Sequence, residues 1–166
     1  RIEGGLDLDL EQALPGAARQ YEPAIEAEAA VAAVFDFMMD RLRVYYTGHG
    51  YGADVFEAVL ARKPSRPVDF DARMRALRGF RERAEAVPLA EANKRIRNIL
   101  RKADGGAADS VDAGVLTDGA ERTLADRIEG LAASVGADVA ARDYQAALTR
   151  LAALAALLDD FFDDVM

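Results

Sequence analysis

The sequence predicts an all-α protein built as a helical bundle. Its 166 residues are the size of one ordinary domain with room for a hydrophobic core. Alanine, leucine, arginine and glutamate predominate, tryptophan is absent and β-branched residues rarely cluster, so intrinsic propensities favour helix over strand almost throughout. Because cysteine is also absent, disulfides and thiolate metal sites are excluded.

No apolar run reaches the roughly 20 residues that a membrane-spanning helix requires, and the first residues lack the basic-then-apolar layout of a secretory signal. We therefore expect a cytoplasmic protein with no membrane partner. The chain begins at Arg1 rather than at methionine and stops within a helical pattern, from which we expect a fragment of a longer protein.

The first two predicted helices lie in the first third of the chain. Residues 6–21 form a weak helix broken at Pro15 and Gly16, and a stronger helix covers residues 24–46. The stronger helix ends at the glycine-rich segment of residues 47–52, and a short helix follows at residues 54–62. The apolar positions of the long helix form one stripe toward a core: Ile25, Val31, Phe35, Met38, Leu42 and Tyr46.

The next helices follow a proline-containing connector, residues 63–71, in which Asp69 is placed to cap a helix. The buried side of that helix is predicted to hold Phe70, Met74, Leu77, Phe80 and Ala84. Proline is tolerated in a first helical turn, so Pro88 is compatible with a further helix at residues 89–103.

Residues 104–119 are rich in glycine, alanine and aspartate and predict a loop, with room for one short helical turn at residues 111–116. Two helices complete the chain, at residues 120–135 and from residue 143 to the end. The second is predicted to bury Leu148, Leu151, Leu154, Leu158 and Phe162.

Catalytic and metal-binding patterns are weak. Asp159, Asp160 and Asp163 match the DDxxD pattern with which helical terpene synthases hold magnesium, but the second metal motif of such enzymes is missing. The favoured interpretation puts Phe162 in the core and these aspartates in solvent. His49, the only histidine, lies in a glycine-rich turn without a neighbouring partner. We therefore predict no catalytic residue, metal site or cofactor in this chain.

Charge is distributed unevenly along the sequence. The formal net charge is −8, yet residues 41–102 hold 15 Lys/Arg against 7 Asp/Glu, while the segments before and after sum to −7 and −9. A basic block between acidic flanks is compatible with a surface for a polyanion, although solvated helix faces also carry such runs.

The densest basic segment is EANKRIRNILRKA, residues 91–103. Leu89, Ala92, Ile96, Ile99 and Leu100 are predicted to give it a buried apolar stripe, and the opposite arc combines basic and amide side chains: Lys94, Arg95, Asn98, Arg101 and Lys102. Amides together with forked guanidinium donors suit RNA better than charge alone. The alternative at this point is an ordinary solvated amphipathic helix.

Five segments, in order, resemble the carboxyl-terminal region of the β subunit of bacterial glycyl-tRNA synthetases: DRLRVYY (40–46), GYGADVFEAVLA (50–61), RMRALRGF (73–80), EANKRIRNIL (91–100) and FFDDVM (161–166). The resemblance implies a helical anticodon-binding domain of the DALR type at residues 21–166. Residues 1–20 would then be a linker or the end of a preceding domain.

The same resemblance implies that this fragment binds glycine tRNA and performs no chemistry. Aminoacylation with ATP and Mg²⁺ would belong to the α subunit, and the partners would be tRNA, the rest of the β subunit and the α subunit, with no role for DNA. The resemblance also implies that DDFFDD, residues 159–164, is a structural motif at the end of the domain. A helical protein-interaction module, docking an acidic partner or another domain of the parent chain, remains the alternative.

Glycine anticodons share a pair of cytosines, whose ring and carbonyl acceptors suit arginine and whose exocyclic amine suits an asparagine oxygen. Tyr45, Tyr46 or Tyr51 could stack a base, although a core role is favoured for all three. The candidate tRNA-binding residues are Arg41, Arg43, Arg75, Arg78, Asn93, Lys94, Arg95, Arg97, Asn98, Arg101 and Lys102.

Overall fold

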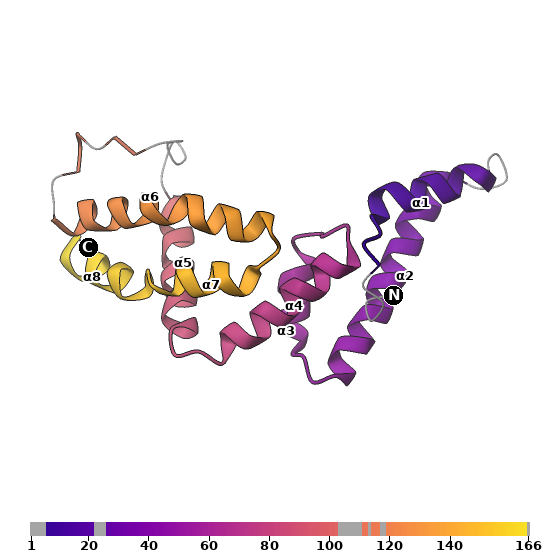
Figure 1. Ribbon diagram of the computed structural model, residues 1–166, viewed down its shortest axis with the longest axis horizontal. Helices are drawn as coiled ribbons and strands as arrows, with labels where there is room; N and C mark the ends of the chain where they lie inside the picture. Colours follow the sequence, from indigo (N-terminus) through magenta and orange to yellow (C-terminus); the bar gives the residue numbers. More distant parts are fainter. Residues whose placement is uncertain (1–5, 22–25, 103–110, 113, 117–118, 166) are drawn as a thin grey trace. The chain divides into compact units, whose positions relative to one another are not determined.

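The computed structural model describes residues 6–21, 26–102, 111–112, 114–116 and 119–165 (Figure 1). Within these residues the chain forms eight α-helices and one 3₁₀ turn and contains no strand, which confirms the all-α prediction. The chain divides into two compact units, unit 1 (Arg1–Arg78) and unit 2 (Gly79–Met166). Each unit has its own apolar core.

Unit 1 begins with α1 (Leu10–Ala18), which the 3₁₀ turn η2 (Arg19–Tyr21) follows. Asp9 caps α1, since its carboxylate accepts a hydrogen bond from the Glu11 backbone N–H at 3.0 Å. The predicted break at Pro15 is wrong, because α1 continues through it. Proline removes a single backbone hydrogen bond here, and burial of Leu10 and Ala18 at the two ends of the helix stabilises it.

The long helix α2 (Ala27–Gly48) confirms the strongest helix prediction, although the expected start at residue 24 lies outside the described residues. Gly50 terminates this segment with φ at +78°, a conformation that glycine adopts readily. Of the predicted stripe, Tyr46 is buried and Phe35 and Leu42 are half-buried, while Ile25 is not described. The short helix α3 (Ala53–Leu60) follows.

The core of unit 1 is aromatic. Tyr46, Phe56, Phe70 and Met74 are its largest fully buried side chains, and the Phe56 and Phe70 ring centroids lie 5.2 Å apart. The Tyr46 hydroxyl donates a hydrogen bond of 2.9 Å to Oδ1 of Asp71. Burial, followed by this contact with a carboxylate, raises the pKa of Tyr46 well above its ordinary value.

Helix α4 (Pro67–Arg81) contributes Phe70 and Met74 to the core of unit 1 and Phe80 to an apolar cluster of unit 2. Pro67 occupies the first helical position, where a missing N–H costs nothing. The prediction that Asp69 caps this helix is wrong. Asp69 lies inside the first turn, and its carboxylate accepts a hydrogen bond of 2.9 Å from Nε of Arg73.

Ala84 was predicted to be buried on the same helix, but it is exposed in the turn that follows the end of α4. Helix α5 (Ala86–Lys102) then begins three residues earlier than predicted, with Pro88 in its first turn as expected. The predicted loop at residues 104–119 falls largely outside the described residues. Within it, the Val115 N–H donates to the Asp112 carbonyl oxygen at 3.1 Å, which closes one turn.

Helix α6 (Gly119–Ala140) is longer than the predicted helix at residues 120–135. Arg142 ends this segment with φ at +60°. The Asp143 N–H reaches the Asp138 carbonyl oxygen at 2.8 Å and the Arg142 N–H reaches the Val139 carbonyl oxygen at 3.0 Å. This pair of bonds is a Schellman motif.

The predicted single carboxyl-terminal helix is wrong, because the structure divides it into α7 (Tyr144–Ala152) and α8 (Ala155–Val165). The Asp143 carboxylate caps α7 by accepting from the Ala146 N–H at 3.0 Å. Between the helices the Leu154 N–H donates to the Leu151 carbonyl oxygen at 3.0 Å. The apolar spacing of this segment is helical on both sides of the turn, so the pattern does not reveal it.

Unit 2 buries many small side chains. One cluster joins Ala92 of α5 to Leu158 and Phe162 of α8 and to Leu154, and a second joins Phe80, Ala86 and Ala152. The predicted positions Leu148 and Leu151 are half-buried at their edges. Helix α6 packs against α7 and α8, and α5 packs against α8 (Figure 1). In the part of the chain that the structure describes, every helix is too short or too polar to cross a bilayer.

Candidate nucleic-acid interface

Helix α5 has one packed side and one open side. Ala92 is buried and Leu89 and Ile96 are half-buried against residues of α8 and its neighbours. The predicted apolar stripe is wrong at its end, because Ile99 and Leu100 are 38% and 46% exposed. These two belong to the last turn of α5, which none of the described apolar clusters covers.

All seven α5 side chains predicted to bind tRNA are exposed, and they form what we call the basic face: Asn93, Lys94, Arg95, Arg97, Asn98, Arg101 and Lys102. Glu91 is the single acidic residue in the sequence of α5. A positive surface with few carboxylates attracts a polyanion and retains it in a salt-dependent way.

Two open hollows lie along the basic face. One, of about 350 Å³, is lined by Glu91, Lys94, Arg95, Asn98, Ile99 and Lys102. The other, of about 440 Å³, is lined by Asn93, Lys94, Arg97, Asn98 and Arg101. Lys94 and Asn98 are common to both, so they form the ridge between the two hollows.

Two arginines of the basic face are held by neighbours. The Arg95 guanidinium carbon lies 4.0 Å from the centroid of the Phe162 ring, a cation–π contact between α5 and α8. Nη2 of Arg101 donates a hydrogen bond of 3.3 Å to Oδ1 of Asn98. Among the described residues no hydrogen bond or ion pair engages the side chains of Lys94, Arg97 and Lys102, so these three cations are available to a ligand.

The other four candidate residues belong to unit 1. Two of them already face a carboxylate: Nη2 of Arg43 lies 2.9 Å from Oε1 of Glu57, and Nη2 of Arg75 lies 2.7 Å from Oδ2 of Asp71. Their positive charge is therefore partly neutralised within the unit, and each would have to share it with a phosphate.

The remaining two, Arg41 and Arg78, lie over aromatic rings. The Arg41 guanidinium is 5.1 Å from the Phe37 ring centroid, and that of Arg78 is 4.7 Å from the Tyr51 centroid. Nη1 of Arg78 also donates to the His49 carbonyl oxygen at 3.5 Å. Because the candidates divide between the two units, the binding of RNA by one surface spanning residues 41–102 stays a prediction.

Of the tyrosines considered for stacking, Tyr46 is buried in the core, so its ring is inaccessible to a base. Tyr45 and Tyr51 are half-buried and meet Tyr46 edge to face, at centroid distances of 5.3 and 5.1 Å. The core role favoured for the tyrosines is thus confirmed for Tyr46.

The acidic motif of α8 has the predicted arrangement, with the aromatic ring in the core and the aspartates in solvent. Phe162 is 5% exposed, whereas Asp159, Asp160 and Asp163 face solvent. Within the described ranges no three histidine or acidic side chains lie close enough to hold a metal ion together. Nδ1 of His49 lies 2.7 Å from the Tyr45 carbonyl oxygen, which ties the imidazole to its own turn.

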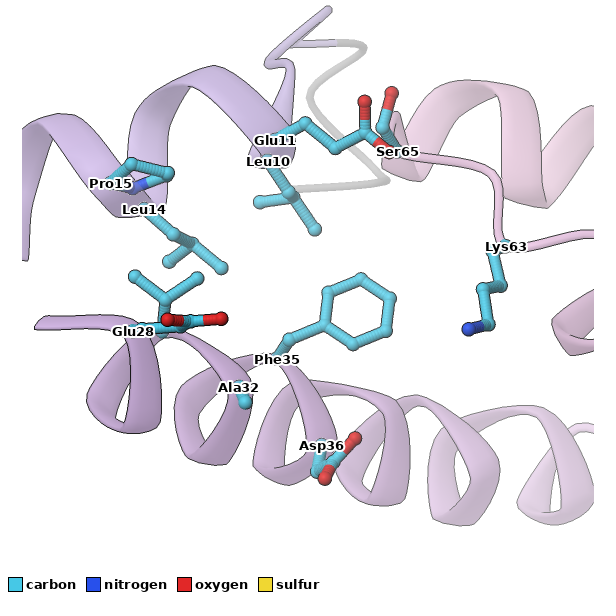
Figure 2. Close-up of a pocket in the computed structure, with 11 residues that line it drawn as sticks. Leu10, Glu11, Leu14, Pro15, Glu28, Ala32, Phe35, Asp36, Lys63 and Ser65 are labelled. Atoms are coloured by element: carbon cyan, nitrogen blue, oxygen red, sulfur yellow. The ribbon is translucent and has the colours of Figure 1, made fainter.

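Sequence reasoning missed a cavity of about 460 Å³ in unit 1, bounded by α1, α2 and the connector before α4 (Figure 2). The Phe35 ring points into it, and the Lys63 side chain extends toward it from the connector. Glu11, Glu28 and Asp36 contribute carboxylates to its lining. The lining comes from three segments distant in sequence, so no local pattern predicts it, and it includes none of the candidate tRNA-binding residues.

Comparison with known proteins finds similarity to glycine–tRNA ligase beta subunits. No family model matches the chain. It is 47% identical over 99% of its length to the glycine–tRNA ligase beta subunit of Tolumonas auensis and to that of Aeromonas hydrophila, and 45% identical over the same share to that of Pseudomonas aeruginosa. The chain spans 24% of the length of each relative, so it is homologous to about a quarter of such a subunit.

Proposed function

We propose that this chain, homologous to part of the glycine–tRNA ligase β subunit, binds the anticodon stem-loop of glycine tRNA through the basic face of α5. The observation that carries the proposal is the arrangement of that face. Lys94, Arg97 and Lys102 are exposed cations that no hydrogen bond or ion pair engages among the described residues. Asn93 and Asn98 lie among them, while Ala92 on the opposite side is packed against α8. Helix α5 thus presents its charges and amides to solvent while its opposite side is held against α8.

The chemistry of such a face suits a hairpin loop. Lysine and arginine neutralise phosphates and fix the orientation of the RNA, whereas amides hydrogen-bond to the edges of unstacked bases. In the proposed division of labour, this chain acts as a DALR-type anticodon-binding domain. It performs no chemistry, and aminoacylation with ATP and Mg²⁺ belongs to the α subunit.

The first experiment is a titration of the chain with the anticodon stem-loop of a glycine tRNA, beside the same hairpin with its two anticodon cytosines changed. Both are measured at two salt concentrations. We expect tighter binding of the native loop at both. The variant Lys94→Ala should weaken binding, while Arg127→Ala on α6, which removes one exposed charge from a different helix of the same unit, is the matched control.

If both hairpins bind equally and in a salt-sensitive way, the basic face binds RNA nonspecifically and does not recognise the anticodon. A separate assay addresses catalysis, because glycine-dependent exchange between ATP and pyrophosphate by the chain alone would refute the proposed division of labour.

A protein-interaction module is the second candidate function. The observation in its favour is that Ile99 and Leu100 expose apolar surface beside Lys102, a mixture common at protein interfaces. Its partner would be acidic, or another domain of the parent chain. Competition separates the two candidates, because unrelated tRNA at low salt should not displace a specific protein partner.

A further inference from the structure

Asn98 occupies the centre of the basic face. It lines both hollows, as only Lys94 also does among the described residues, and it is the uncharged member of that ridge. Its side chain takes part in one hydrogen bond in the described structure, in which Oδ1 accepts from Nη2 of Arg101 at 3.3 Å. Both N–H groups of Nδ2 and the second lone pair of Oδ1 are therefore free for a ligand.

The bond from Arg101 favours one of the two orientations of the Asn98 amide. A guanidinium carries five N–H donors and no acceptor, so the amide atom that faces it must be the oxygen. The reversed amide would place N–H against N–H and lose the hydrogen bond. An isolated exposed asparagine has no such preference and can rotate to suit either a donor or an acceptor.

A fixed amide distinguishes cytosine from uracil. It offers an acceptor, Oδ1, on the side of Arg101 and a donor, Nδ2, on the other side. Cytosine matches this order, since its N4 amine donates and the adjacent N3 accepts, while uracil presents the acceptor O4 next to the donor N3–H. Uracil can restore the match only by turning over or by sliding along the amide until its N3–H and O2 take the places of N4 and N3. Either movement is opposed when phosphate contacts hold the loop in register.

We propose, resting on the function proposed above, that Asn98 reads one unpaired cytosine of the anticodon and that Arg101 is a positioning residue that fixes the Asn98 amide for it. The sequence identified Arg101 only as a candidate tRNA-binding residue, a role that a phosphate contact alone would satisfy. The observed bond gives it a different role, in which it contributes to the choice of base. Lys94, beside Asn98 on the ridge, remains a phosphate ligand.

The test compares the native glycine anticodon hairpin with two hairpins in which one or the other anticodon cytosine is replaced by uracil. For the position that Asn98 reads, the chain should prefer cytosine by about 5-fold to about 150-fold, the range of one good bidentate contact. Asn98→Ala should remove the preference at that position alone. Gln145→Ala, which removes an exposed amide from α7 of the same unit, should leave it intact.

Arg101→Met isolates the positioning role. It should weaken binding of all three hairpins and, in addition, reduce the ratio of cytosine to uracil binding at the Asn98 position. Arg97→Met also removes one charge from the same face, but among the described residues Arg97 makes no hydrogen bond to the Asn98 side chain. This variant should weaken binding to a similar extent and leave the ratio unchanged. A purely electrostatic role for Arg101 would make the two variants indistinguishable.

The outcomes separate this inference from the proposed function. If the chain prefers the native hairpin and Asn98→Ala retains the preference at both cytosines, the inference is overturned while anticodon binding stands. If Arg101→Met leaves the ratio unchanged, the positioning role is overturned. If the unmodified chain binds all three hairpins equally, both the proposed function and the inference fail.

Discussion

The guanidinium of Arg95 on α5 lies directly against the ring of Phe162 on α8, at 4.0 Å from its centroid. This contact joins the basic segment to the end-motif, two of the five segments that carry the family resemblance. It also holds the Arg95 head group against α8, so that this arginine supports the position of α5 while keeping its own positive charge.

Replacing Phe162 with alanine should lower the free energy of unfolding by about 3 to 5 kcal/mol, because it removes a buried ring and leaves a cavity beside Ala92. Urea unfolding followed by circular dichroism measures the change. Asp163→Ala, at the exposed neighbouring position, should change stability by less than about 0.5 kcal/mol. A loss below about 1 kcal/mol in the Phe162 variant would mean that α8 does not depend on this ring.

Tyr46→Phe should destabilise the chain by about 1 to 3 kcal/mol, because the Asp71 carboxylate loses a hydrogen bond of 2.9 Å from a buried hydroxyl. The ring itself is retained, so the packing of the aromatic core should not change. Tyr21→Phe, at a tyrosine that is largely exposed, is the control. Equal urea midpoints for the two variants would contradict a structural role for the Tyr46 hydroxyl.

The same residue predicts a dependence on alkaline pH. Burial and the neighbouring carboxylate raise the pKa of Tyr46 in the folded chain, so the folded state keeps this proton where the unfolded state releases it. The stabilisation is complete below about pH 10, the ordinary tyrosine value, and falls as the pH rises above it. Stability measured from pH 9 to 11 should fall more steeply for the unmodified chain than for Tyr46→Phe, and parallel curves would refute the assignment.

Lys63→Gly should stabilise unit 1 by about 0.5 to 1 kcal/mol. Lys63 has φ at +46°, a left-handed conformation that is costly for a residue with a Cβ and accessible to glycine. Thermal unfolding measures the gain. Arg62→Gly, one residue earlier and without a positive φ, supplies the comparison and should not stabilise the chain. A loss of stability in the Lys63 variant would show that its side chain contributes more than its backbone conformation costs.

Lys102→Ala should weaken the binding of every RNA hairpin by a similar factor, because a phosphate contact carries no sequence information. The slope of log affinity against log salt concentration should become shallower by roughly 0.7 to 0.9. Fluorescence anisotropy at four salt concentrations measures the slope. An unchanged slope would place Lys102 outside the RNA contact, and Arg127→Ala should show that result.

The sequence predicted the helical class and the long and basic helices because their apolar periodicity is sustained over several turns. The sequence-based prediction was wrong where a single position decides whether a helix continues or ends. The Ala153–Leu154 turn lies within an unbroken alanine- and leucine-rich pattern, and Pro15 is accommodated by a helix that its burial stabilises. Neither outcome is visible in local propensity.

For the candidate site, the exposure of the basic face followed from the spacing of its charges. The partners of those charged side chains could not be predicted from spacing, since the Arg95–Phe162 and Arg43–Glu57 contacts each join two different helices. The Asn98–Arg101 bond is local and was accessible from the sequence, because residues three apart on a helix are neighbours. The cavity near Phe35 required the arrangement of three segments.

Helix α4 belongs to both units, since the boundary between Arg78 and Gly79 falls inside it. A truncation at that boundary would separate Phe80 from the rest of its helix and leave a frayed end in either product. A piece that begins at Pro67 keeps the helix whole, but it exposes Phe70 and Met74, which the core of unit 1 buries. The two units are therefore best produced together, as one continuous chain.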